Sequence, residues 1–231
     1  MFRPALAAVL TITAAAPALA APVAADAAHP TVVELYQSQG CSSCPPAIHN
    51  VNALADRPDV LTLTFAVTYW DQLGWKDTFA TPQQTARQWA YARSLGHDQV
   101  WTPQVIVDGR SDVVGARPGQ VVDLLARTPP RVGPALTLAT GAVSVGTGSA
   151  PAGGADVWLV RYDPRTIAVA VRAGENGGRT IDHRNVVRQL IKLGHWTGAA
   201  ATMTLPASIP GLQTAVLIQK PGGAILAAVR G

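Results

Sequence analysis

The chain has only two cysteines, Cys41 and Cys44, and they stand where a strand pattern gives way to a helix pattern. Residues 31–36 are rich in β-branched and apolar side chains, with Glu34 among them, which predicts a short buried strand. Beyond the cysteines, apolar side chains recur on one helical face, at Ile48, Val51 and Leu54. A Cys-x-x-Cys pair at the start of a helix, directly after a buried strand, is the strongest constraint that this sequence places on its fold.

The elements that follow predict a β-α-β-α-β-β-α order over residues 31–128. The expected segments are a strand at 60–68, a helix at 81–95, a hairpin made of 104–108 and 112–115, and a helix at 118–126. Thr81 is the expected N-cap of the second helix, and Gly96 its end. With the cysteine pair in place, this order resembles the thioredoxin fold, and the run Thr128-Pro129-Pro130 is interpreted as a domain boundary.

The second half of the chain has a different pattern. Seven short β-type runs are separated by Gly, Pro and Asn, at residues 136–138, 143–145, 157–162, 167–171, 203–205, 215–219 and 224–229. They predict a mainly-β, sandwich-like C-terminal domain over residues 134–231. The stretch 185–193 is ambiguous, because its apolar residues Val186, Val187, Leu190 and Ile191 also fit a helix.

The N-terminus has the pattern of a signal peptide over residues 1–20. Arg3 precedes an apolar run at 5–16, and Ala18-Leu19-Ala20 is a cleavage signal. We therefore expect an exported bacterial protein, periplasmic or secreted, with an uncleaved anchor helix as the alternative. No later segment of the sequence is long and apolar enough to span a membrane. The net charge of +4 comes from scattered residues rather than a basic patch, which argues against nucleic-acid binding.

The cysteine pair predicts thiol-disulfide exchange with protein thiols or disulfides. A thiolate is the attacking species, and a helix N-terminus stabilises it, so Cys41 is the expected nucleophile and Cys44 the resolving thiol. A disulfide without catalytic function is the alternative. Two thiolates could also bind Cu(I), whereas structural zinc needs four ligands, so no metal or other cofactor is assigned.

The resemblance to thioredoxins implies further site residues. Those enzymes place a buried acid below the resolving cysteine as proton acceptor, and Glu34 is the candidate, although it stands seven residues before Cys41, one more than the usual spacing. The alternative is a glutamate on an edge strand that faces solvent. They also have a cis-proline beside the cysteine pair, which implies this role for Pro103. Thr102, Trp70 and Trp101 are the candidate substrate-binding residues, the alternative being that the aromatic side chains of the loop at 69–75 fill a domain join.

Two longer segments resemble an exported bacterial family known only as domain of unknown function 1223. The first runs from Val32 through the cysteine pair to Ala47, and the second is 174–180 with the polar residues near it. The resemblance implies a thioredoxin-like domain with a β-rich partner, and no established reaction. Glu175, Asn176, Arg179 and His183 form a polar cluster in and just after the second segment, interpreted as a turn with Asn176-Gly177 at its tip. The alternative is that the β-rich domain packs over the cysteine pair and His183 stabilises a thiolate or moves a proton. A binding module on a thioredoxin scaffold is a further alternative.

Overall fold

The computed structural model describes residues 24–231, so the predicted signal peptide, residues 1–20, lies outside the described residues. Between residues 31 and 128 the elements follow the predicted order. They are β1 (Thr31–Gln37), α1 (Cys44–Asn52), β2 (Val60–Ala66), the 3-10 turn η1 (Asp71–Leu73), α2 (Pro82–Leu95), β3 (Gln104–Val107), β4 (Ser111–Val113) and α3 (Gln120–Arg127). The rest of the chain is β-structure: β5 (Leu136–Ala139), β6 (Ala142–Val145), β7 (Ala155–Asp163), β8 (Ile167–Ala170), β9 (Thr180–His183), β10 (Val186–Trp196), β11 (Ala201–Thr204), β12 (Gln213–Gln219) and β13 (Ile225–Arg230).

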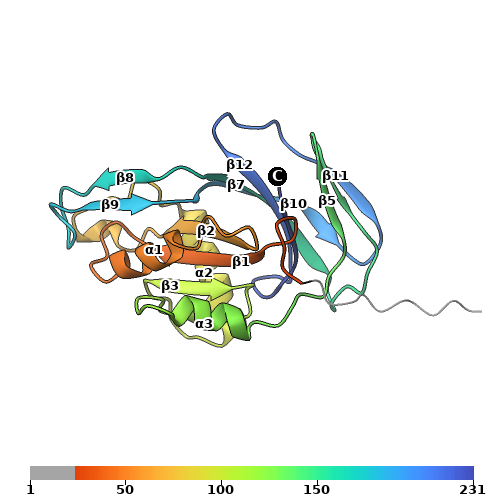
Figure 1. Ribbon diagram of the computed structural model, residues 1–231, viewed down its shortest axis with the longest axis horizontal. Helices are drawn as coiled ribbons and strands as arrows, with labels where there is room; N and C mark the ends of the chain where they lie inside the picture. Colours follow the sequence, from red (N-terminus) through yellow and green to blue (C-terminus); the bar gives the residue numbers. More distant parts are fainter. Residues whose placement is uncertain (1–23) are drawn as a thin grey trace, which may run out of the picture.

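Strands from both halves of the chain form one mixed sheet, in the order β13-β12-β7-β10-β2-β1-β3-β4 (Figure 1). β1 is parallel to β2 and antiparallel to β3. The two halves meet where β10 runs parallel to β2, through the pair Val186 and Thr64. The protein is therefore a mixed α/β structure with a shared central sheet, and the domain boundary expected between residues 128 and 134 stays a prediction.

The two faces of the large sheet are covered by different elements, and the side chains of β1 point alternately to one face and the other. Val32 and Tyr36 belong to the apolar cluster on the face that α2 covers. Val33 and Leu35 belong to the cluster on the other face, together with residues of α1, α3 and β9. Because successive side chains of a strand point to opposite faces, a shift of one position moves a residue from one cluster to the other.

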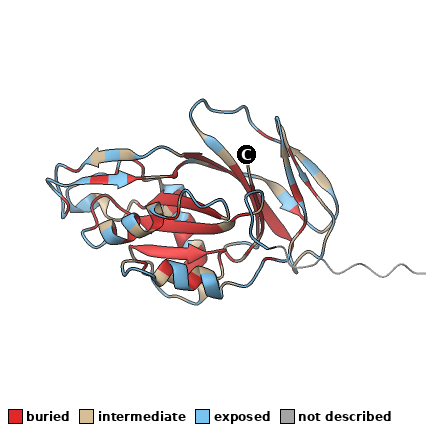
Figure 2. Cartoon of the chain, in the orientation of Figure 1, coloured by how far each residue is buried: buried red, intermediate tan, exposed pale blue. Residues whose placement is uncertain are grey.

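The remaining strands form two smaller layers at opposite ends of the sheet. The three-stranded sheet β11-β6-β5 packs on one end of the large sheet through a third apolar cluster, which includes Val143, Leu159 and Val216. The β8–β9 hairpin lies beside α1 at the other end (Figure 1). The strands of the large sheet are largely buried between these layers, and the outer turns are exposed (Figure 2).

Local signals explain where the helices begin and end. Thr81 caps α2 as predicted, because its Oγ1 accepts the Gln84 N–H at 3.3 Å, and Gly96 ends the helix with a φ of 79°. α3 begins at Gln120, two residues after the predicted start at 118, because Gly119 takes a positive φ of 83° directly before it. No helix in the described range is long and apolar enough to cross a membrane.

The ambiguous stretch 185–193 belongs to a strand, β10. Its helix-like spacing has a physical cause, since the pairing of β10 with β7 shifts register between Val187 and Gln189 and again between Lys192 and Gly194. Each bulge moves the next side chain out of strict alternation. The seven β-type runs expected in the second half all coincide with strands, and β9 is a strand that the sequence did not indicate.

Candidate functional site

Cys41 and Cys44 form a disulfide at the junction of β1 and α1, with their Cα atoms 5.4 Å apart. Cys44 is the first residue of α1, and its N–H donates to the Cys41 carbonyl at 3.1 Å, so Cys41 lies in the turn before the helix. Pro45 is tolerated in the first helical turn, where a missing N–H costs no hydrogen bond. Both cysteines are 0% exposed, and they belong to the apolar cluster on the α1 face of the sheet.

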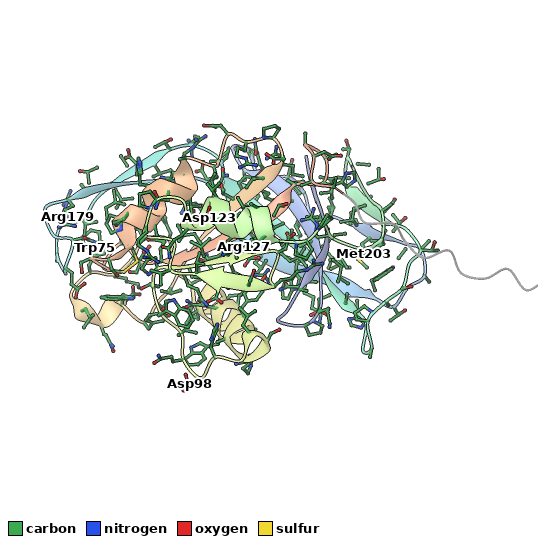
Figure 3. The ribbon with its side chains drawn as sticks, turned by 60° about the horizontal axis from the view of Figure 1, so that its bottom comes forward. Trp75, Asp98, Asp123, Arg127, Arg179 and Met203 are labelled. Carbon is green, nitrogen blue, oxygen red and sulfur yellow. A yellow bond between two sulfur atoms is a disulfide. The ribbon has the colours of Figure 1, made fainter. Side chains whose placement is uncertain are left out.

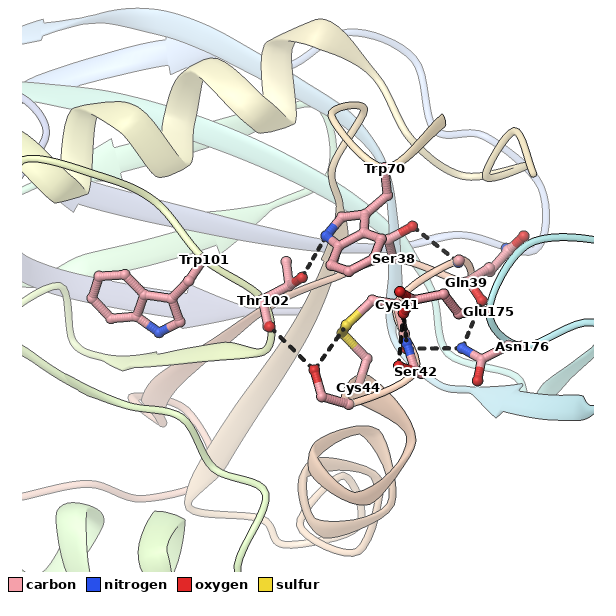
Figure 4. Close-up of a disulfide and its surroundings, with 12 residues drawn as sticks. Ser38, Gln39, Cys41, Ser42, Cys44, Trp70, Trp101, Thr102, Glu175 and Asn176 are labelled. Atoms are coloured by element: carbon pink, nitrogen blue, oxygen red, sulfur yellow. Dashed lines mark hydrogen bonds between the residues drawn. A yellow bond between two sulfur atoms is a disulfide. The ribbon is translucent and has the colours of Figure 1, made fainter. Parts of the chain in front are cut away.

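Two predicted residues, Thr102 and Trp70, lie next to the disulfide (Figure 4). The Cys41 Sγ lies 3.3 Å from the Ser43 Oγ, which donates to the Thr102 carbonyl at 3.4 Å. Trp70 Nε1 donates to the Thr102 Oγ1 at 2.7 Å. The peptide bond between Thr102 and Pro103 is cis, as expected. The structure therefore gathers the cysteine pair, Trp70, Thr102 and Pro103 in one place, and adds Ser43, which the sequence did not single out.

Trp101 is directed away from this site. Its indole packs edge-on against His97, with ring centroids 4.9 Å apart, and Figure 4 shows it beyond Thr102 from the cysteines. Its carbonyl accepts a hydrogen bond from Gln88 Nε2 at 2.7 Å. The Trp101 side chain therefore lies beside α2 and the β3–β4 hairpin, and not at the disulfide.

Glu34 lies on the opposite face of β1 from the disulfide, which corrects the expectation that it sits below Cys44. Its carboxylate pairs with Arg87, at 2.6 Å from Nη2 and 3.0 Å from Nε. The hydroxyls of Tyr36 and Tyr91 also donate to it, at 2.7 and 2.9 Å. Burial raises the pKa values of both phenols well above the ordinary value, so they remain protonated donors.

The reason for this placement is the spacing of Glu34 from the cysteines. At seven residues before Cys41 it has the wrong parity for the α1 face, and its neighbour Leu35 occupies that face instead. No bulge is present in the pairing of β1 with β2 to restore the parity. Glu34 therefore lacks the contact with Cys44 that a proton acceptor needs.

The connection between β8 and β9 reaches the cysteine turn from the second half of the chain. The Glu175 carboxylate accepts hydrogen bonds from the Ser42 N–H at 3.0 Å and the Ser42 hydroxyl at 2.7 Å. Asn176 Nδ2 donates to the carbonyls of Gln39 and Cys41, at 2.9 and 2.8 Å. The sequence identified the Asn176-Gly177 turn but gave no sign of its partner, because the two segments are more than 130 residues apart.

The aromatic loop after β2 supports the segment that leads to Cys41. Trp75 Nε1 donates to the Gln39 Oε1 at 2.9 Å, and the Gln39 N–H donates to the Asp77 carboxylate at 2.7 Å. Burial raises the pKa of Asp77 to about 6. In Figure 3, Trp75 lies at the same end of the molecule as Arg179 of the β8–β9 connection, and Met203 lies toward the other end.

His183 contributes no polar contact to the cysteine site. It is fully buried, packs edge-on against Phe79 with ring centroids 5.5 Å apart, and neither ring nitrogen has a hydrogen-bond partner among the described residues. Burial lowers its pKa to about 4, so the ring is neutral at physiological pH. Over residues 24–231, no group of three or more His, Cys, Asp or Glu side chains is arranged to hold a metal ion.

Comparison with known proteins identifies the family of this chain. A family model described as "Protein of unknown function (DUF1223)" matches residues 32–219, which include the cysteine site and the β8–β9 connection. The chain belongs to the DUF1223 family. No curated protein matches it.

Two solved structures are similar to this DUF1223 protein. A crystal structure of an Agrobacterium tumefaciens protein, from a structural genomics consortium, has 33% sequence identity and a TM-score of 0.72, covering 87% of this chain and 92% of that one. HBP35 of Porphyromonas gingivalis has 11% identity and a TM-score of 0.55, covering 88% of this chain and 75% of that one. At 11% identity the second likeness concerns the fold alone.

Proposed function

We propose that this DUF1223 protein is an exported thiol-disulfide oxidoreductase, with Cys41 and Cys44 as its redox centre on a thioredoxin-like fold. The observation that carries the proposal is the disulfide at the β1–α1 junction, with the Ser43 hydroxyl 3.3 Å from the Cys41 Sγ. Once the pair is reduced, that hydroxyl can turn its proton from the Thr102 carbonyl to a Cys41 thiolate and favour its formation. Export rests on the signal-peptide pattern of residues 1–20.

The proposed reaction is a two-step exchange. In the reducing direction, the Cys41 thiolate attacks one sulfur of a partner disulfide, which forms a mixed disulfide and releases the partner's other sulfur as a thiolate. Cys44, as a thiolate, then attacks the Cys41 sulfur, which releases the partner's remaining thiol and restores the Cys41–Cys44 disulfide. The oxidising direction is the reverse of these steps.

The test is the reduction potential of the couple, measured on the protein lacking residues 1–20 in graded glutathione or dithiothreitol buffers. A value between about −270 and −120 mV lies in the range of exchange catalysts and supports the proposal. A value below about −300 mV, typical of structural disulfides, contradicts it and favours the binding module. In the first case, Cys41→Ser should abolish reduction or oxidation of a model protein substrate.

Copper titration of the reduced protein separates the remaining alternative. A Cu(I) site made by Cys41 and Cys44 alone would saturate at one ion and be lost in both Cys→Ser variants. Exchange activity that persists with a copper chelator present supports the oxidoreductase over the copper protein.

A further inference from the structure

A loop of the second half of the chain is hydrogen-bonded to the turn that holds the disulfide. Residues 171–179 connect β8 to β9 and are here called the cover loop. Val171, the first residue of this loop, belongs to the same buried cluster as both cysteines. Neither Cys41 nor Cys44 is exposed. Thiol-disulfide exchange requires a thiolate to reach a sulfur atom directly. Part of the surrounding structure must therefore move before either cysteine can react with a partner, and the cover loop is the segment of the second half that is hydrogen-bonded to the cysteine turn.

Few contacts hold the tip of the cover loop in place. Glu175 is exposed and is attached through the hydrogen bonds that it accepts from Ser42, whereas Asn176 is buried and donates to the Gln39 and Cys41 carbonyls. The loop also rests on the aromatic loop after β2, since a Cβ atom on Gly174 would lie 3.2 Å from the Trp75 Cβ. Glycines at 174, 177 and 178 give the tip the backbone freedom to change shape.

The turn before α1 offers few N–H donors, and Glu175 uses one of them. Pro45 and Pro46 have no N–H, and the Cys44 N–H already donates to the Cys41 carbonyl. The Ser42 N–H donates to Glu175. The Ser42 N–H is therefore one of the two serine N–H groups of this turn, with that of Ser43, that could stabilise a negative charge at Cys41.

Glu175 also brings a negative charge to this turn. The hydrogen bonds from the Ser42 hydroxyl and N–H hold the pKa of Glu175 below its usual value, so it is ionised at neutral pH. The other charged groups nearby are Asp77, which accepts the Gln39 N–H, and Arg179, whose Nη1 lies 3.2 Å from the Asn176 Oδ1. A thiolate at Cys41 would therefore form one residue from a backbone N–H that is already bonded to a carboxylate.

We propose that Glu175 is a positioning residue that controls the reactivity of Cys41, holding the cover loop over the disulfide and opposing formation of the Cys41 thiolate. This inference rests on the proposed exchange function and deepens it. Release of the Glu175 contact frees the Ser42 N–H and uncovers the sulfur atoms, so opening of the loop and activation of the nucleophile favour each other. A protein partner then takes the place of the cover loop beside the cysteine turn.

The test uses two variants that separate the contact from the charge. Glu175→Gln keeps an oxygen that accepts from Ser42 and removes the charge, whereas Glu175→Ala removes both. The control is Asp182→Asn, which removes one charge from an exposed position on β9 of the same hairpin. The first readout is the rate at which dithiothreitol reduces the Cys41–Cys44 disulfide. The two thiols of dithiothreitol supply two electrons and two protons and close into a disulfide of their own. The second is the pH midpoint of Cys41 alkylation in the Cys44→Ser background.

The two readouts have different expected patterns. Glu175→Ala should be reduced about tenfold faster than the parent protein, because it loses both hydrogen bonds from Ser42, whereas Glu175→Gln should stay within about threefold. Glu175→Gln should lower the alkylation midpoint by about half a pH unit, the effect of removing one nearby charge in a partly solvated site. Asp182→Asn should change neither value.

An unchanged reduction rate in Glu175→Ala, or an unchanged alkylation midpoint in Glu175→Gln, overturns the proposal. Neither readout needs catalytic turnover, so the result is independent of the proposed function. A structural-type reduction potential together with faster reduction of Glu175→Ala would refute the oxidoreductase and leave the cover loop standing. A reduction potential in the range of exchange catalysts, with no effect of either variant, would support the oxidoreductase and refute the role of Glu175.

Discussion

Glu34 and Arg87 form an ion pair of 2.6 Å that lies across β1 from the disulfide and is almost completely buried, at 1% and 6% side-chain exposure. Arg87 also donates to Gln219 at the start of the β12–β13 turn, at 2.9 Å. The pair thus joins β1 and α2 of the first half to a strand of the second half. Its role in the fold is structural, and it has no contact with the cysteines.

Glu34→Gln should therefore lower stability and leave the redox couple unchanged. Removing one partner of a buried pair leaves an uncompensated charge, and we expect a loss of about 3 kcal/mol in the free energy of unfolding. Asp59→Asn, which breaks the exposed pair with Arg57, should cost less than about 1 kcal/mol. Denaturant titration measures both, and a reduction potential that shifts in Glu34→Gln would restore Glu34 to the redox mechanism.

Ser43→Ala should raise the pKa of Cys41 in the reduced protein. The Ser43 hydroxyl contacts the Cys41 Sγ and makes no side-chain cap of α1, so the variant removes a donor to the thiolate without removing a helix cap. We expect an upward shift of about one unit, since a hydrogen bond to a charged group is worth roughly 1.5 kcal/mol. The pH dependence of alkylation in the Cys44→Ser background measures it. A midpoint that stays in place would show that another group stabilises the thiolate.

His183→Leu should stabilise the protein in mild acid. Burial lowers the pKa of His183 from 6.5 to about 4, so its contribution to stability is complete above about pH 6.5 and is lost as the pH falls toward 4. At pH 5 the variant should gain about 2 kcal/mol over the parent, apart from any change in packing against Phe79. Unfolding titrations at pH 5 and pH 7.5 give the difference, with His49→Leu at an exposed position of α1 as control. An equal effect at both pH values would contradict the assignment.

Asp77 should act in the opposite direction over nearly the same range. Burial raises its pKa from 3.8 to about 6, so the favourable neutral form is complete below about pH 4 and is lost as the pH rises through 6. The parent protein should lose up to about 3 kcal/mol of this contribution by pH 7, and Asp77→Asn should remove the pH dependence. The difference between the two unfolding curves at pH 4 and pH 7 tests this, and parallel curves would argue against a titrating Asp77.

Local signals predicted most elements of the fold, and long-range pairing decided the rest. Short sequence patterns predict the N-cap of α2 at Thr81 and its end at Gly96, and both predictions are confirmed. The sequence of β10 is ambiguous because the bulge between Val187 and Gln189 gives its apolar residues a helix-like spacing. The joining of the two halves in one sheet depends on the contact of Val186 with Thr64, which no local pattern encodes.

The candidate site likewise combines residues that local patterns predict with residues that only long-range contacts bring in. Cys41, Cys44 and the Thr102-Pro103 pair follow from motif and position, and the structure brings them together. The prediction that Glu34 lies below Cys44 is wrong, because a change of one residue in spacing moves a strand side chain to the other face of the sheet. The sequence indicates Glu175 only as part of a polar turn, because its partner Ser42 stands far away in the sequence.

The late arrival of β10 has a consequence for biosynthesis. β2 is buried along its whole length, and its open edge is covered by residues 185 and 186, which leave the ribosome long after residue 66. Until then the nascent chain presents an unpaired apolar strand, the kind of surface that recruits other chains. Any shielding of this strand is therefore needed until residues 185 and 186 have left the ribosome and paired with Thr64.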